Sequence, residues 1–150
     1  MLKVDILLEL LRSLDAHVNT LEKLRPASME VWKEDIENYW AVLHGLQLAI
    51  QHVIDISAHI LAGQNLSSPA DYREALSELG RHKIIPVTFA EKIEGMAGLR
   101  NILVHRYLGV DPQKVFKAVD SDLDDFRTFI AYIEGYLRRE GHLPSEEQGT

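Results

Sequence analysis

Apolar residues recur every three or four positions along most of the chain, the spacing that gives an α-helix one apolar face. Strict alternation of apolar and polar residues, which marks a half-buried strand, is weak throughout. The helices expected from this pattern cover residues 4–24, 29–62, 69–79, 89–108 and 112–140. We therefore expect an all-α fold, an up-and-down bundle of four to five helices.

Residues at the ends of these runs are typical helix signals. Pro26 ends the first helix, because proline disfavours the α conformation in the residue before it. A kink is expected near Asp120 and Ser121 in the last helix. The residues suited to N-caps are Ser28, Ser68, Thr88 and Asp111. We expect one domain over residues 1–140, followed by a flexible polar tail over 141–150.

The second predicted helix is the longest, at about 35 residues or about 50 Å. Between Asn38 and Ala62 its only formal charge is Asp55, so it is nearly uncharged on all sides. The histidines and glutamines in this segment would be costly in lipid, so we do not expect it to span a membrane. A helix without a charged face is normally buried all round, which favours a homodimer interface along it.

Composition removes several classes of chemistry. The 150 residues include no cysteine, so disulfides, thiolate metal sites and cysteine nucleophiles are excluded. The net charge of −7 argues against a protein that coats nucleic acid. It is compatible with a small, locally basic RNA-cutting cleft, to which Arg100 and Arg106 or the basic cluster at 81–83 would contribute. A cytoplasmic location fits this composition.

The richest chemistry lies within two turns of the fourth predicted helix, at Arg100, Asn101, His105 and Tyr107. Arg100 falls on the apolar stripe, so it needs a partner or a cleft. Asn101 is four residues before His105, so its amide can orient the imidazole. Arginine can hold a phosphate and histidine can move protons near neutral pH. RNA supplies its own nucleophile, the 2′-hydroxyl, so neither a metal nor a cofactor is required. The competing interpretation is a structural arginine–carboxylate pair beside an ordinary core tyrosine.

A second polar group lies on the long helix, where His52, Asp55 and His59 share one face. The spacing allows a metal site, but a hydrogen-bonded polar seam is the favoured interpretation. Asp55 is expected either to balance the charge of Arg100 or to bind a histidine at a dimer seam.

Aromatic and glycine residues elsewhere are read as packing features. Trp32, Tyr39 and Trp40 are expected in the core or at an interface. Gly95 and Gly98 follow no strand, so they do not form a phosphate loop. They are expected to permit close helix packing.

The segment from Arg100 to Tyr107, Arg-Asn-Ile-Leu-Val-His-Arg-Tyr, resembles the Arg-x4-His-x-Tyr signature of the HepT-like toxins. These toxins belong to the HEPN superfamily of helical ribonucleases. Residues 96–99 before the signature, 109–111 after it and 48–56 on the long helix are also similar to that family, as is the order of helices up to Arg139.

The resemblance implies a role for each signature residue. Arg100 and His105 would be the catalytic pair of a metal-independent endoribonuclease toxin, at a cleft formed by two protomers. Asn101 would support them. Tyr107 would be adenylylated by a cognate MntA-like minimal nucleotidyltransferase, the antitoxin. The alternative is a non-catalytic nucleotide-binding helical module, or the companion subunit of a nucleotidyltransferase.

Overall fold

A computed structural model of the chain describes residues 2–105 and 109–144. Every regular element in these ranges is helical, which confirms the all-α prediction. In chain order the helices are α1 (Val4–Leu24), α2 (Met29–Lys33), α3 (Ile36–Gly63), α4 (Tyr72–Arg81), α5 (Val87–Ile93), α6 (Gly95–His105), α7 (Pro112–Asp120) and α8 (Leu123–Arg139).

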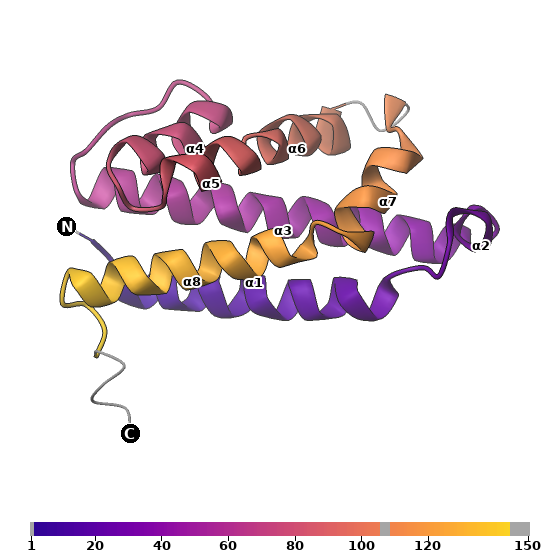
Figure 1. Ribbon diagram of the computed structural model, residues 1–150, viewed down its shortest axis with the longest axis horizontal. Helices are drawn as coiled ribbons and strands as arrows, with labels where there is room; N and C mark the ends of the chain where they lie inside the picture. Colours follow the sequence, from indigo (N-terminus) through magenta and orange to yellow (C-terminus); the bar gives the residue numbers. More distant parts are fainter. Residues whose placement is uncertain (1, 106–108, 145–150) are drawn as a thin grey trace.

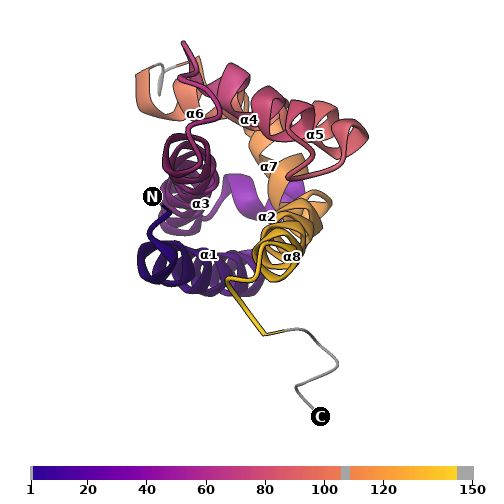
Figure 2. The ribbon, with the colours of Figure 1, turned by 90° about the vertical axis from the view of Figure 1, so that its left-hand side faces the viewer.

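The helix α3 is the spine of the bundle, as its length predicts. It contacts α1, α2, α4, α6 and α8. Figure 1 shows α1 and α8 running alongside one another below α3, while α4, α5 and α6 form a layer above it. The end-on view in Figure 2 shows these elements surrounding a common centre. Side chains from all of these elements fill the space between them with one continuous apolar core.

Three of the expected helices are each interrupted once. The long second run breaks at Glu34, where Asp35 caps α3 by accepting a hydrogen bond from the backbone N–H of Asn38 at 3.1 Å. The break lets Trp32 turn inward, where it is 2% exposed and donates to Asn38 Oδ1 at 2.9 Å. The fourth run bends at Glu94, immediately before Gly95, a residue that weakens helices. The predicted kink near Asp120 is confirmed, because α7 ends there.

Two of the four predicted N-caps are confirmed. The side chain of Ser28 accepts from Val31 N, and that of Asp111 accepts from Gln113 N. The prediction for Ser68 is wrong, because Asp71 takes that role one turn later.

The prediction for Thr88 is also wrong, since Pro86 occupies the cap position of α5 and Thr88 lies inside the helix. Gly80 lies inside α4, one residue beyond the predicted end of the third helix at 79. An ideal Cβ there would be 2.8 Å from Cβ of Ala90, so this glycine allows α4 and α5 to approach.

In the single chain the long helix keeps an exposed side, along which the homodimer interface is expected. Trp40 is 64% exposed, and His44 and His59 are exposed as well. Trp32 is a core residue, but Trp40 is not. No helix in the part of the chain that the structure describes is long and apolar enough to cross a bilayer. Of the predicted tail, residues 145–150 lie outside the described residues.

Candidate functional site

Arg100 is held at the place where α6 meets α3 and α4. Its Nε donates to Oε1 of Gln51 on α3 at 3.0 Å. Its guanidinium carbon lies 4.7 Å from the ring centroid of Tyr72, the first residue of α4, in cation–π geometry. The predicted need for a partner is therefore met by an amide and an aromatic ring.

Asp55 is connected to Arg100 through Gln51. The Nε2 of Gln51 donates to Oδ1 of Asp55 at 2.8 Å, one helical turn further along α3. This bond fixes which end of the amide faces Arg100, because the nitrogen is committed to the carboxylate and the oxygen is left to accept. The arrangement resembles the first expectation for Asp55, with the negative charge one side chain away from the arginine.

Asn101 and His105 lie on the more open side of α6. The Oδ1 of Asn101 accepts from Nη1 of Arg100 at 3.3 Å, so this side chain contacts the arginine and not the imidazole. Asn101 and His105 are both exposed and line a surface depression of about 540 Å³, together with Gly98 and Ile102. Tyr107, predicted as the adenylylation site, lies outside the described residues.

These contacts define what the site can do chemically. A guanidinium with a fixed orientation lies on one side, and an exposed imidazole lies five residues further along the same helix. Arginine in a fixed orientation stabilises developing charge on phosphate oxygens without reorganisation. An exposed histidine can give or take a proton from a bound molecule. The pair suits phosphodiester chemistry with proton transfer.

His52 belongs to a different polar group, on the opposite side of α3. Its Nδ1 is 2.7 Å from the carbonyl oxygen of Leu48, and its Nε2 is 3.0 Å from Oγ of Ser13 on α1. Its ring meets that of His17 edge-on at 5.0 Å. Burial lowers the pKa of His17, and the neighbouring His52 and His44 lower it further.

The face formed by His52, Asp55 and His59 therefore does not converge. His52 is directed toward α1, Asp55 toward Gln51 on the α6 side, and His59 is exposed. Among the described residues there is no group of three or more acidic or histidine side chains placed to hold a metal ion.

The basic cluster at 81–83 lies apart from Arg100. Arg81 and His82 each approach the carboxylate of Glu78, at 3.0 and 3.1 Å. The Glu78 side chain is only 8% exposed, so the two residues surround a buried carboxylate. Arg81 and His82 therefore have a local structural role in balancing this carboxylate.

The prediction that Gly95 and Gly98 permit close helix packing is wrong. An ideal Cβ at Gly95 would meet nothing within 4 Å. One at Gly98 would meet only the Nη2 atom of Arg73, at 3.8 Å. Neither glycine is required by a neighbouring helix.

Sequence reasoning did not assign roles to two residues of this site, Gln51 and Tyr72. Gln51 lies 49 positions before Arg100, and a neutral amide carries no charge signal. Its position four residues before Asp55 was the available clue, since such pairs are neighbours on a helix. Tyr72 fits the apolar pattern of α4, so its spacing alone indicates a packing residue.

The fold and the site together define the class: this chain is a helical bundle that carries an arginine and a histidine suited to phosphodiester chemistry on one helix. Residues 8–133 match the family described as ribonuclease HepT-like. This chain belongs to the HepT-like ribonuclease family, and the expected family is confirmed.

Two relatives carry nuclease names. The chain is 34% identical over 123 residues to a tRNA nuclease HepT of Aphanizomenon flos-aquae, covering 81% of this chain and 82% of the relative. It is 32% identical over 103 residues to an mRNA nuclease HepT of Shewanella oneidensis, covering 69% and 77%.

Solved structures agree in fold. A toxin–antitoxin crystal structure with AMP-PNP has a TM-score of 0.81 and 26% identity, covering 87% of this chain and 98% of that one. A tri-AMPylated Shewanella oneidensis HEPN toxin in complex with MNT antitoxin has a TM-score of 0.80 and 27% identity, with the same coverage.

Proposed function

We propose that this protein is the toxin of a HepT/MntA-type toxin–antitoxin pair, a metal-independent endoribonuclease that acts in the cytoplasm. The observation that carries the proposal is the fixed orientation of Arg100 beside the depression that His105 lines, in a chain of the HepT-like ribonuclease family. The nuclease names of the two relatives support an RNA substrate.

In this proposal Arg100 and His105 are the catalytic residues. The 2′-hydroxyl of RNA attacks the adjacent phosphorus, and the bond to the 5′-oxygen of the next nucleotide breaks. His105 takes the proton from the hydroxyl or supplies one to the leaving oxygen. Arg100 stabilises the extra negative charge on the pentacoordinate phosphate. Asn101 and Asp55 are supporting residues, because both hold the orientation of Arg100, directly or through Gln51.

A homodimer completes the cleft in this proposal. From Trp40 to Gln51 the helix α3 carries no formal charge, and Trp40 and His44 in this stretch are exposed. Covering this stretch with a second copy would remove apolar surface from water and bring two sites together.

Neutralisation is proposed to occur at Tyr107, by adenylylation from an MntA-like minimal nucleotidyltransferase antitoxin. The similar Shewanella oneidensis toxin is AMPylated and bound to an MNT antitoxin. Tyr107 follows His105 by two residues, so an added phosphate there would lie beside the cleft and repel RNA.

The test compares growth arrest and RNA cleavage by wild type, Arg100→Ala and His105→Ala. His59→Ala, which removes another exposed histidine, is the control. Both site variants should lose cleavage and toxicity with unchanged helix content, while the control keeps them. If both site variants cleave RNA like wild type, the proposed function is wrong. If the wild type does not cleave RNA and both site variants lose nucleotide or antitoxin binding, the non-catalytic alternative is favoured.

A further inference from the structure

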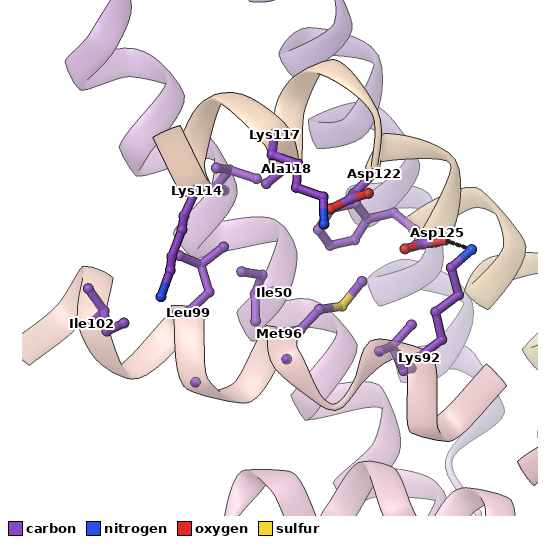
Figure 3. Close-up of a pocket in the computed structure, with 15 residues that line it drawn as sticks. Ile50, Lys92, Met96, Leu99, Ile102, Lys114, Lys117, Ala118, Asp122 and Asp125 are labelled. Atoms are coloured by element: carbon purple, nitrogen blue, oxygen red, sulfur yellow. Dashed lines mark ion pairs between the residues drawn. The ribbon is translucent and has the colours of Figure 1, made fainter. Parts of the chain in front are cut away.

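A groove of about 460 Å³ lies on the side of α6 that faces α7 and α8 (Figure 3). Its floor includes the buried side chains of Ile50 and Phe126. Met96 and Leu99 of α6, both partly buried, form one wall. The floor and this wall are apolar and large enough to accept a flat ring system or a comparable apolar group.

The rim of this groove is cationic, in contrast to the acidic chain as a whole. Lys92, at one end, is paired with Asp125 at 3.0 Å. Lys114 and Lys117 are exposed, stand three residues apart on α7, and form no ion pair within the described residues. Figure 3 shows Lys114 extending from α7 toward Leu99 of α6. The remaining carboxylate on the rim is Asp122, so cations outnumber acids there.

The groove is continuous with the candidate catalytic site. Gly98 and Ile102 line both the groove and the depression that contains Asn101 and His105. Gly98 has no side chain, and an ideal Cβ there would meet only Nη2 of Arg73, at 3.8 Å, so the helix surface between the two hollows is low. A chain molecule lying at His105 can therefore pass over α6 into the groove.

We propose that this groove binds a nucleotide of single-stranded RNA next to the cleaved phosphodiester. Lys114 and Lys117 hold backbone phosphates, and the base lies against Met96 and Leu99. Apolar surface beside a cationic rim is the arrangement with which proteins bind single strands. A base in a duplex could not lie against Met96 and Leu99 in this way, because its two faces are covered by the neighbouring bases. The proposal rests on the ribonuclease function proposed above and adds how the substrate is positioned.

The direct test measures RNA binding by a protein that cannot cut it. In a His105→Ala background, Lys114→Ala/Lys117→Ala is compared with Lys3→Ala/Lys23→Ala, which removes two exposed lysines of equal charge from the ends of α1. Fluorescence anisotropy with a single-stranded RNA oligomer gives Kd at several salt concentrations. Because each phosphate contact contributes about 0.7 to the slope of log K against log salt, the groove variant should lose about 1.4 of slope. Its Kd at 0.1 M salt should be about 20-fold weaker, and the control should match the parent.

Steady-state cleavage in proteins that keep His105 gives a second measurement. Lys114→Ala/Lys117→Ala should raise KM for the oligomer by a similar factor and change kcat much less, since the lysines position RNA and do not touch the reacting atoms. Circular dichroism melts establish that both double variants fold.

The outcomes separate the two proposals. If wild type cleaves RNA but the groove variant binds it like the control, the groove proposal is wrong and the ribonuclease proposal stands. If the groove variant loses its antitoxin and binds RNA normally, the occupant is a protein and the proposal is again overturned. If wild type neither cleaves nor binds RNA, the ribonuclease function itself fails.

Discussion

Two helices pack on the same spine in different ways. The helix α1 meets α3 and buries Leu7, Leu11, Leu14, Val18 and Leu21. The helix α6 also meets α3, but it buries only Ala97 and Leu103. It also reaches the spine through the hydrogen bond from Arg100 to Gln51. The helix α1 therefore contributes more to the stability of the fold, while α6 buries fewer side chains and places polar groups at the surface.

The polar residues of α3 also differ between the side that faces α1 and the side that faces α6. His52 and Gln51 are neighbours in sequence and face opposite seams. Both ring nitrogens of His52 lie within hydrogen-bonding distance of an oxygen, from Leu48 and Ser13, so the α1 seam is closed. Gln51 binds a half-buried arginine beside an open depression. Polar groups that are all bonded within the chain, as between α1 and α3, stabilise the fold. Polar groups beside an open depression, as between α6 and α3, can bind a ligand.

The largest expected effect is on stability, at the α1 seam. Leu14→Ala should lower the free energy of unfolding by about 2–5 kcal/mol, because a fully buried leucine is replaced by a cavity. Urea denaturation measures the loss. Cleavage per folded molecule should stay near that of wild type. The matched control is Ile6→Ala, at a position 37% exposed on the same helix, which should cost far less. Equal losses in the two variants would contradict the packing difference.

The next effect is on activity, at the α6 seam. Arg100→Lys keeps the charge but removes the planar fork and the Nε donor that binds Gln51. We expect kcat/KM for RNA to fall about 100-fold, or about 2.7 kcal/mol of transition-state stabilisation, with little change in stability. A lysine variant with near-wild-type cleavage would mean that charge alone suffices at this position.

Two glycines sharpen the comparison further, because one is packed and the other is open. Gly80→Ala places a methyl 2.8 Å from Cβ of Ala90 and should destabilise by about 1–3 kcal/mol. At Gly98 the added methyl would meet only Nη2 of Arg73, at 3.8 Å, so Gly98→Ala should stabilise by about 0.5–1 kcal/mol, because alanine is the better helix former. Thermal melts of the two variants should move in opposite directions. A fall in both would place an unrecognised contact at Gly98.

Gln51 should matter less than Arg100, because it only holds the arginine in place. Gln51→Ala is expected to lower kcat about tenfold, or about 1.4 kcal/mol, because it removes the amide that holds the guanidinium and links it to Asp55. Gln47→Ala, one turn earlier on α3, is the control for losing an amide of similar exposure. If both variants have the same kcat, the link from Arg100 through Gln51 to Asp55 has no role in cleavage.

Much of the fold follows from local sequence signals. The bounds of α1 agree with the prediction at both ends, and α3 ends at Gly63, one residue beyond the predicted end at 62. The interruptions at Glu34 and Glu94 were not predicted, because the apolar spacing continues across both. The first depends on Trp32 turning inward to bind Asn38, a contact that the periodicity alone does not specify.

The site was predictable only in part, for a similar reason. The local spacing indicated that Arg100 needs a partner, and Asp55 was the charged residue available on the long helix. The partner in the structure is Gln51, whose amide lies between Arg100 and Asp55. The sequence does not give the distance between α6 and α3 that leaves room for this amide. The openness at Gly98 could not be predicted either, since it depends on which helices do not come close.

The smallest expected effect is the pH dependence of the α1 seam. Burial, with His52 and His44 nearby, lowers the pKa of His17 in the folded state below its ordinary 6.5. Below that pH the unfolded chain takes up a proton that the folded chain resists, so stability falls as pH drops from 6.5. His17→Gln should reduce the shift in urea midpoint between pH 7.5 and 5.5, measured against wild type. If the urea midpoint of the variant shifts as much as that of wild type, groups other than His17 cause the loss of stability at low pH.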